Sequence, residues 1–203
     1  PEANPILTNN TFSFEGSQYS GIGLISGSMT ADGTLKIRSN NEYDNLTYVV
    51  IADIAVPENI SLTIDKGVVI KFNDDENNNS DPNFFIQGNL TANASVDSMI
   101  IFTSIKDDNV GQPLDTNMDG MDTSPTTGSW DGIVFENTSD PSSILNFCNI
   151  KYGEHYYYQD YDNDWETSYN YFDGYHYEGA VQLFDASPTI TNCQFKEVKY
   201  GIW

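Results

Sequence analysis

An acidic loop over residues 107–122 has the residue types and spacing of a site for a hard cation. Its oxygen-bearing side chains include Asp107, Asp108, Asp115, Asn117, Asp119 and Asp122. Asp115, Asn117 and Asp119 alternate and are followed by Gly120, so their side chains can converge inside a sharp turn that glycine permits. We therefore expect a Ca²⁺ site in this loop. The alternative interpretation is a solvated series of Asx turns in a chain rich in Asp and Asn.

The loop departs from the EF-hand pattern in one respect. An EF-hand carries a bidentate glutamate at its twelfth position, and counting from Asp115 that position is Thr126. A calcium site here must therefore take a ligand from outside the alternating run. Asp107 and Asp108 are the candidates for that ligand.

A second segment, residues 153–178, is inserted between strand-forming regions and is rich in aromatic and acidic residues. Its acidic residues alternate as weaker candidates for cation ligands: Asp160, Asp162, Asp164 and Glu166. Its candidate ligand-binding residues are Tyr156, Tyr157, Tyr158, Trp165, Tyr171 and Tyr175. Such rings present large rigid faces that stack on sugars or anchor a protein partner. The alternative is that they pack the segment onto the side of the fold.

No catalytic residues can be assigned from the sequence. Glycoside hydrolysis uses two carboxylates at a defined separation, and carboxylates are so frequent in this chain that no pair stands out. The two histidines, His155 and His176, lack the spacing to a cysteine that a zinc site requires.

The charge balance limits the partners. The chain has 30 acidic and 8 basic residues, a net charge of −22, and Arg38 as its single arginine. Such a surface repels nucleic acid and anionic membranes, because phosphates need Lys and Arg to replace their counterions. We expect no nucleic-acid partner and no membrane insertion, since no apolar run reaches the length of a membrane span. The partners that this charge favours are a cation, a glycan or a protein surface.

The elements that position these loops are short β-strands separated by Asn, Asp, Gly, Pro and Ser. They are expected at residues 48–51, 62–64, 68–72, 84–86, 99–103, 133–135, 144–152, 180–184 and 189–195. Residues 1–40 are expected to form lead-in strands or a cap. Residues 41–203 are expected to form the coils of a solenoid that continues beyond residue 203, with residues 153–178 inserted as a loop.

Internal repetition distinguishes a solenoid from a sandwich or barrel. The matched pairs are Ile133 with Val181, Cys148 with Cys193 and Ile150 with Phe195, and a third round opens at Ile202. The interval from Val181 to Ile202 is 21 residues, which suits one short coil. This register places Cys148 and Cys193 on neighbouring coils, as stacked thiols or, alternatively, as a disulfide in an oxidising compartment.

Four segments resemble the right-handed parallel β-helix repeat proteins of the pectate-lyase-like superfamily. They are YVVIADIAVPENISLTIDKGVVIKF at 48–72, FIQGNLTA at 85–92, IIFTS at 100–104 and WDGIVF at 130–135. The resemblance implies an all-β, right-handed parallel β-helix within a large bacterial protein that is secreted and attached to the cell surface. It also implies that an Asp-Asn-Asp-Gly loop ahead of the Trp-x-Gly-Ile strand binds structural calcium.

Two functions follow as expectations. The first is a non-catalytic structural or adhesive segment, stabilised by calcium, that contacts a glycan or protein through its aromatic loop and joins flanking parts of a longer chain. The second is the N-terminal part of a carbohydrate-active enzyme, a polysaccharide lyase or glycoside hydrolase, with catalytic coils beyond residue 203. An ice-binding solenoid ranks third, because no flat, repeated threonine array is evident in the sequence.

Overall fold

The computed structural model describes residue 10 and residues 18–74, 81–154 and 179–203. This part of the chain contains 16 strands and no helix. Every strand-to-strand pairing in it is parallel. None of the described segments forms a helix long and apolar enough to cross a membrane.

The strands form three parallel sheets, which we name A, B and C. Sheet A contains β1 (Ile22–Leu24), β4 (Tyr48–Val50), β7 (Val69–Phe72), β10 (Ile100–Ser104), β13 (Cys148–Lys151) and β16 (Gln194–Lys196). Sheet B contains β2 (Gly27–Ser28), β5 (Ile54–Val56), β8 (Asn83–Ile86), β11 (Gly132–Phe135) and β14 (Val181–Leu183). Sheet C contains β3 (Gly33–Leu35), β6 (Ser61–Ile64), β9 (Asn89–Asn93), β12 (Ile144–Asn146) and β15 (Thr189–Thr191).

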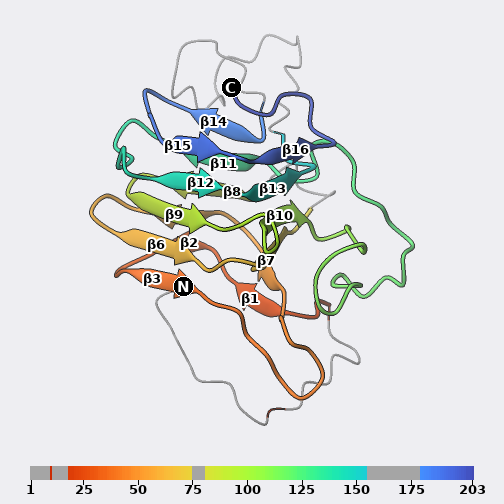
Figure 1. Cartoon of the computed structure of the whole chain (residues 1–203). Helices are drawn as coiled ribbons and strands as arrows, with labels where there is room; N and C mark the ends of the chain where they lie inside the picture. The colour runs from red at the N-terminus through yellow and green to blue at the C-terminus, as the bar shows by residue number, and fades with distance from the viewer. Residues whose placement is uncertain (1–9, 11–17, 75–80, 155–178) are drawn as a thin grey trace.

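Each strand from β1 to β13 pairs with the strand three places later in the chain, so three strands make one coil. Figure 1 shows the coils stacked in chain order, from the red and orange coil of β1 and β3 to the blue coil of β14, β15 and β16. This arrangement is the all-β, right-handed parallel β-helix expected from the sequence repeat. Stacking satisfies the backbone groups of each coil with those of its two neighbours.

The predicted repeat is confirmed residue by residue. Ile133 pairs with Val181, and Ile150 pairs with Phe195. The third round is present as well, because Val181 forms a parallel bridge with Ile202 and accepts a backbone hydrogen bond from Trp203 at 2.9 Å.

Two predicted strands are each broken in two. The 144–152 region bends at Phe147, with φ of 53°, and the 189–195 region bends at Asn192, with φ of 54°. A residue in the left-handed region turns the chain sharply, so at both places the chain passes from sheet C to sheet A.

The first coil comes from residues assigned to the lead-in segment. Strands β1, β2 and β3 pair in parallel with β4, β5 and β6 and so belong to the β-helix itself. Residues 1–9 and 11–17 of that segment lie outside the described residues.

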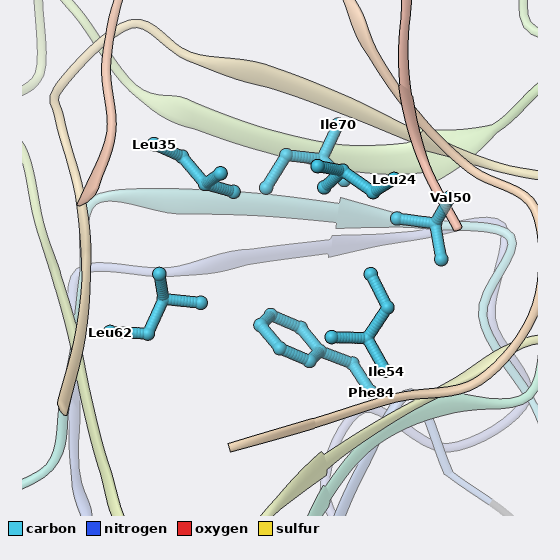
Figure 2. A pocket seen from close by; sticks show the side chains of 7 residues that line it. All are labelled: Leu24, Leu35, Val50, Ile54, Leu62, Ile70 and Phe84. Atoms are coloured by element: carbon cyan, nitrogen blue, oxygen red, sulfur yellow. The ribbon is translucent and has the colours of Figure 1, made fainter. Parts of the chain in front are cut away.

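The interior is apolar, because alternate residues of all three sheets point inward. Between the first coils, side chains from sheets A, B and C enclose a cavity of about 10 Å³, as Figure 2 shows. Its lining residues are Leu24, Leu35, Val50, Ile54, Leu62, Ile70 and Phe84. Further along the axis, Trp130 is fully buried and stacks on Phe72.

Candidate cation site on sheet A

The acidic loop 107–122 lies across the outer face of sheet A. The backbone N–H of Ser20 donates to Thr116 O at 2.9 Å, and that of Thr47 donates to Gln112 O at 3.1 Å. The Lys71 Nζ group donates to Leu114 O at 2.7 Å. These bonds come from residues ahead of β1, ahead of β4 and within β7, so the loop is fixed to successive coils.

A column of lysines on this face explains why an acidic loop covers it. Lys71 pairs with Thr103, and Lys151 pairs with Lys196. The register between β10 and β13, continued by one residue, places Thr103 beside Lys151. Three of the eight basic residues therefore align on one outward column.

Lys71 is fully buried although it points away from the core. Burial lowers its pKa to about 8, while the negative charges of Asp108, Asp107 and Asp115 act to raise it. The loop carboxylates thus serve as counter-ions for an ammonium group that has little contact with water. Sequence reasoning missed this residue; the only signal was a lysine within an otherwise apolar strand.

Asp107 faces the lysine column. Its Oδ2 accepts from Thr103 Oγ1 at 2.7 Å and forms an ion pair with Lys151 Nζ, and its Oδ1 accepts from the Asn109 amide at 3.2 Å. Burial alone would raise the pKa of Asp107, but the hydrogen bonds from Lys151 and Thr103 outweigh it and hold that pKa below its ordinary value. Both oxygens are engaged within the protein.

Asp108, Asp115 and Asp119 come together in a carboxylate cluster. One oxygen from each lies within 4.8 Å of the others. The Asp115 carboxylate accepts from the backbone N–H groups of Asp119 at 3.1 Å and Gly120 at 2.9 Å. Gly120 has φ of 69°, as the sharp turn requires.

The remaining loop ligands behave differently from one another. Asn117 donates from Nδ2 to Asp119 Oδ2 at 2.8 Å, so its side chain lies against the cluster. The Asp122 carboxylate is exposed and outside the cluster, although its backbone N–H donates to Asp119 Oδ1 at 3.2 Å. The weaker acidic candidates and the aromatic ligand-binding candidates of residues 155–178 lie outside the described residues.

Two buried oxygens at this cluster lack a donor within the described residues. They are Asp108 Oδ1 and Asn117 Oδ1. Asp108 is 7% exposed, and burial raises its pKa, while the positive charge of Lys71 lowers it. A buried acceptor without a donor is unfavourable by about 1–3 kcal/mol, and more for a charged group. Carboxylate and amide oxygens are the ligands that Ca²⁺ takes, so the residues fit this ion.

The structure therefore brings together four of the six predicted ligands, Asp108, Asp115, Asn117 and Asp119. The alternating run supplies two of the three carboxylates in the cluster, those of Asp115 and Asp119. Asp108, from the start of the loop, supplies the third. Asp107 is directed to Lys151 instead.

The two cysteines form a separate feature inside the coil. The register places Cys148 and Cys193 on neighbouring coils, and both are thiols. Cys148 Sγ lies 3.7 Å from Ala92 O and Cys193 Sγ lies 3.4 Å from Leu145 O, which are equivalent positions one coil apart. A hydrogen bond between the thiols, and then burial, raises the pKa of Cys148; the same bond lowers the pKa of Cys193 to about 7.

In comparisons with known proteins, no family, no curated protein and no solved structure matches this chain.

Proposed function

We propose that this chain is a non-catalytic structural or adhesive β-helix segment of a secreted, cell-surface protein, stabilised by calcium. We place it with the pectate-lyase-like superfamily that its sequence resembles. The observation that carries the proposal is the buried Asp108 Oδ1, which has no donor among the described residues and lies in a cluster with Asp115 and Asp119.

The charge of the cluster supports a bound cation. Three carboxylates meet there, and Lys71 supplies one neighbouring positive charge. A divalent ion coordinated by Asp108, Asp115, Asn117 and Asp119 would neutralise the remaining charge and fasten the loop to sheet A. Loops of this kind with modest ligand charge suit extracellular calcium concentrations, which favours a secreted protein.

The adhesive part of the proposal concerns residues 155–178. Their tyrosines and Trp165 provide rigid, amphipathic faces for a glycan or a protein partner. The net charge of −22 favours neutral partners over anionic ones.

The test is thermal unfolding in chelator and in added CaCl₂ or MgCl₂. An ion at a hundredfold excess over its Kd stabilises the folded state by about 2.7 kcal/mol, which raises the Tm by several degrees for a chain of this length. Calcium should raise the Tm of the wild type and of Asp122→Asn, the matched control in the same loop. Calcium should leave the Tm of Asp108→Asn unchanged, because that variant lacks one of the cluster's carboxylates. Identical wild-type melting curves with and without calcium would overturn the proposal.

The non-catalytic part has its own assay. Incubation with neutral and acidic polysaccharides should release no reducing or unsaturated ends. Release of either would establish the enzyme alternative instead.

A further inference from the structure

The outer face of sheet C carries a threonine column that the sequence does not reveal. Consecutive registers align one outward position in all five strands: Thr34, Thr63, Thr91, Ile144 and Thr189. The array was hidden because insertions make the intervals between these residues unequal. In the structure they recur at the spacing of neighbouring strands, about 4.7–4.9 Å.

A second outward column runs beside the first. It contains Asp65, Asn93, Asn146 and Thr191, since Ile64 pairs with Ala92 and Asn146 pairs with both Asn93 and Thr191. Asn146 Nδ2 donates to Asn93 Oδ1 at 2.8 Å, and Thr191 Oγ1 donates to Asn146 Oδ1 at 2.9 Å. Asn93, Asn146 and Thr191 are thus joined to one another by side-chain hydrogen bonds.

On the coils of β6 and β9, the same face contains a groove of about 370 Å³. Its polar lining comes from both columns and from the turn after β6: Thr63, Thr91, Asp65, Asn93 and Lys66. Ile37 forms an apolar wall and is 41% exposed. This volume is within the range of small-ligand sites, roughly 300–1,000 Å³.

The polar groups on the groove floor are available to a ligand. Among the described residues, no side chain bonds to Thr63 Oγ1, to the Asp65 carboxylate or to the Lys66 ammonium. Thr91 Oγ1 donates to Asn89 at 3.0 Å and keeps its lone pairs free to accept. The groove therefore offers hydroxyl, carboxylate and ammonium groups on a rigid parallel sheet.

We propose that this groove binds a neutral oligosaccharide. Asp65 and Lys66 balance each other, so the groove is neutral in a chain of net charge −22 and is matched to a ligand without charge. A carboxylate beside hydroxyls recognises the donors and acceptors of sugar hydroxyls, and Ile37 packs on the apolar face of a sugar ring. Ice is a poorer match, because Ile37 projects beside the threonines and the second column holds Asp and Asn.

This inference deepens the adhesive role and rests on it, but none of the groove residues belongs to the segment 155–178. Glycan binding by the groove and glycan binding by the aromatic segment can therefore be tested separately. Isothermal titration with cellotriose, mannotriose and chitotriose tests both, with melting curves to verify that each variant is folded.

The wild type should bind at least one neutral trisaccharide. Thr63→Val combined with Thr91→Val keeps the β-branched shape, removes both hydroxyls and should weaken binding at least tenfold. Thr189→Val makes the same change in the same column, outside the groove, and should leave the affinity unchanged.

Each of the following results would overturn the groove as the site. Binding that survives the double substitution would do so, as would an equal loss in Thr189→Val. Binding that is abolished by Trp165→Ala and retained by the double variant would move the site to the aromatic segment and keep the adhesive role. Absence of binding to all three sugars in the wild type would count against both.

Discussion

The indole ring of Trp130 lies flat against the ring of Phe72, with centroids 4.0 Å apart and planes inclined by 9°. Trp130 is completely buried and donates from Nε1 to Lys151 O at 2.8 Å. The pair connects strand β7 with the segment just before β11 and lies in the apolar interior of the coil. Space for the indole depends on a glycine in the next coil.

Gly153 is that glycine. A Cβ atom at this position would lie 2.8 Å from Trp130 Cζ2, so Gly153→Ala should destabilise the protein by about 1–3 kcal/mol through overpacking. Gly23 in β1 has no neighbour within 4 Å of the same atom, and Gly23→Ala should stay within about 0.5 kcal/mol of the wild type. Urea denaturation followed by tryptophan fluorescence measures both. Equal effects would refute the packing argument.

Removal of the Lys71 charge should destabilise the protein, because the loop carboxylates then lose their neighbouring ammonium group. In chelator, Lys71→Met leaves Asp108 and Asp115 without their nearest ammonium group and should destabilise the fold by about 3 kcal/mol. Added calcium should restore more stability to this variant than to the wild type. Lys196→Met, in the same column but exposed, is the control and should have little effect. Equal loss in the two variants would contradict the role of Lys71.

Acid should weaken the contact between the loop and sheet A. Because the pKa of Asp107 is held below its ordinary 3.8, its stabilising contribution is complete above that pH and is lost as the pH falls through the lower folded-state value. Asp107→Asn lacks this contribution. The stability difference between wild type and Asp107→Asn, measured in chelator by urea denaturation, should therefore narrow as the pH falls below 3.8. A constant difference would show that the Asp107 charge does not contribute.

The thiols should react at different rates. Cys193 is partly exposed, and the hydrogen bond from Cys148 lowers its pKa to about 7, so iodoacetamide should modify it first at neutral pH. Cys148 is fully buried and should react only after unfolding. Peptide mass mapping after timed alkylation distinguishes them, with Cys193→Ser as the control that loses the fast phase. Equal rates in the native protein would contradict the buried position of Cys148.

The cavity in the first coils offers a stabilising substitution. Val50 lines it, and Val50→Ile should raise the free energy of unfolding by about 0.5–1 kcal/mol by filling empty space (Figure 2). Val56 is equally buried and does not line the cavity, so Val56→Ile should destabilise the protein by about 1–3 kcal/mol. Urea denaturation of both variants would test the contrast. Two losses would show that the cavity cannot accept a methylene group.

Much of the coil could be predicted from the sequence, because the strands alternate apolar and polar residues and the pairs Ile133–Val181 and Ile150–Phe195 recur at matching places. The first coil could not, since β2 is only two residues long and contains glycine. The bends at Phe147 and Asn192 were also missed, because a single left-handed residue leaves no pattern in an otherwise continuous apolar run.

The candidate sites also contain some residues that the sequence could predict and others that it could not. Asp115, Asn117 and Asp119 were recognisable because their spacing is local. The choice of Asp108 over Asp107 depends on Lys71 and Lys151, which lie far away in sequence and are set beside the loop only by the stacking of coils. The column of Thr63 and Thr91 likewise exists only after the coils are in register.

The attachment of the acidic loop has a consequence for how the molecule unfolds. In a solenoid each coil contacts only its neighbours, so terminal coils can detach one at a time. Loop 107–122 joins Ser20, Thr47 and Lys71 to the coil of Asp107 and, through Lys151, to the next. It therefore adds contacts between coils that do not touch, as a brace does along a stack. Fraying from the N-terminal end would first have to release this brace, so the first five coils should open together.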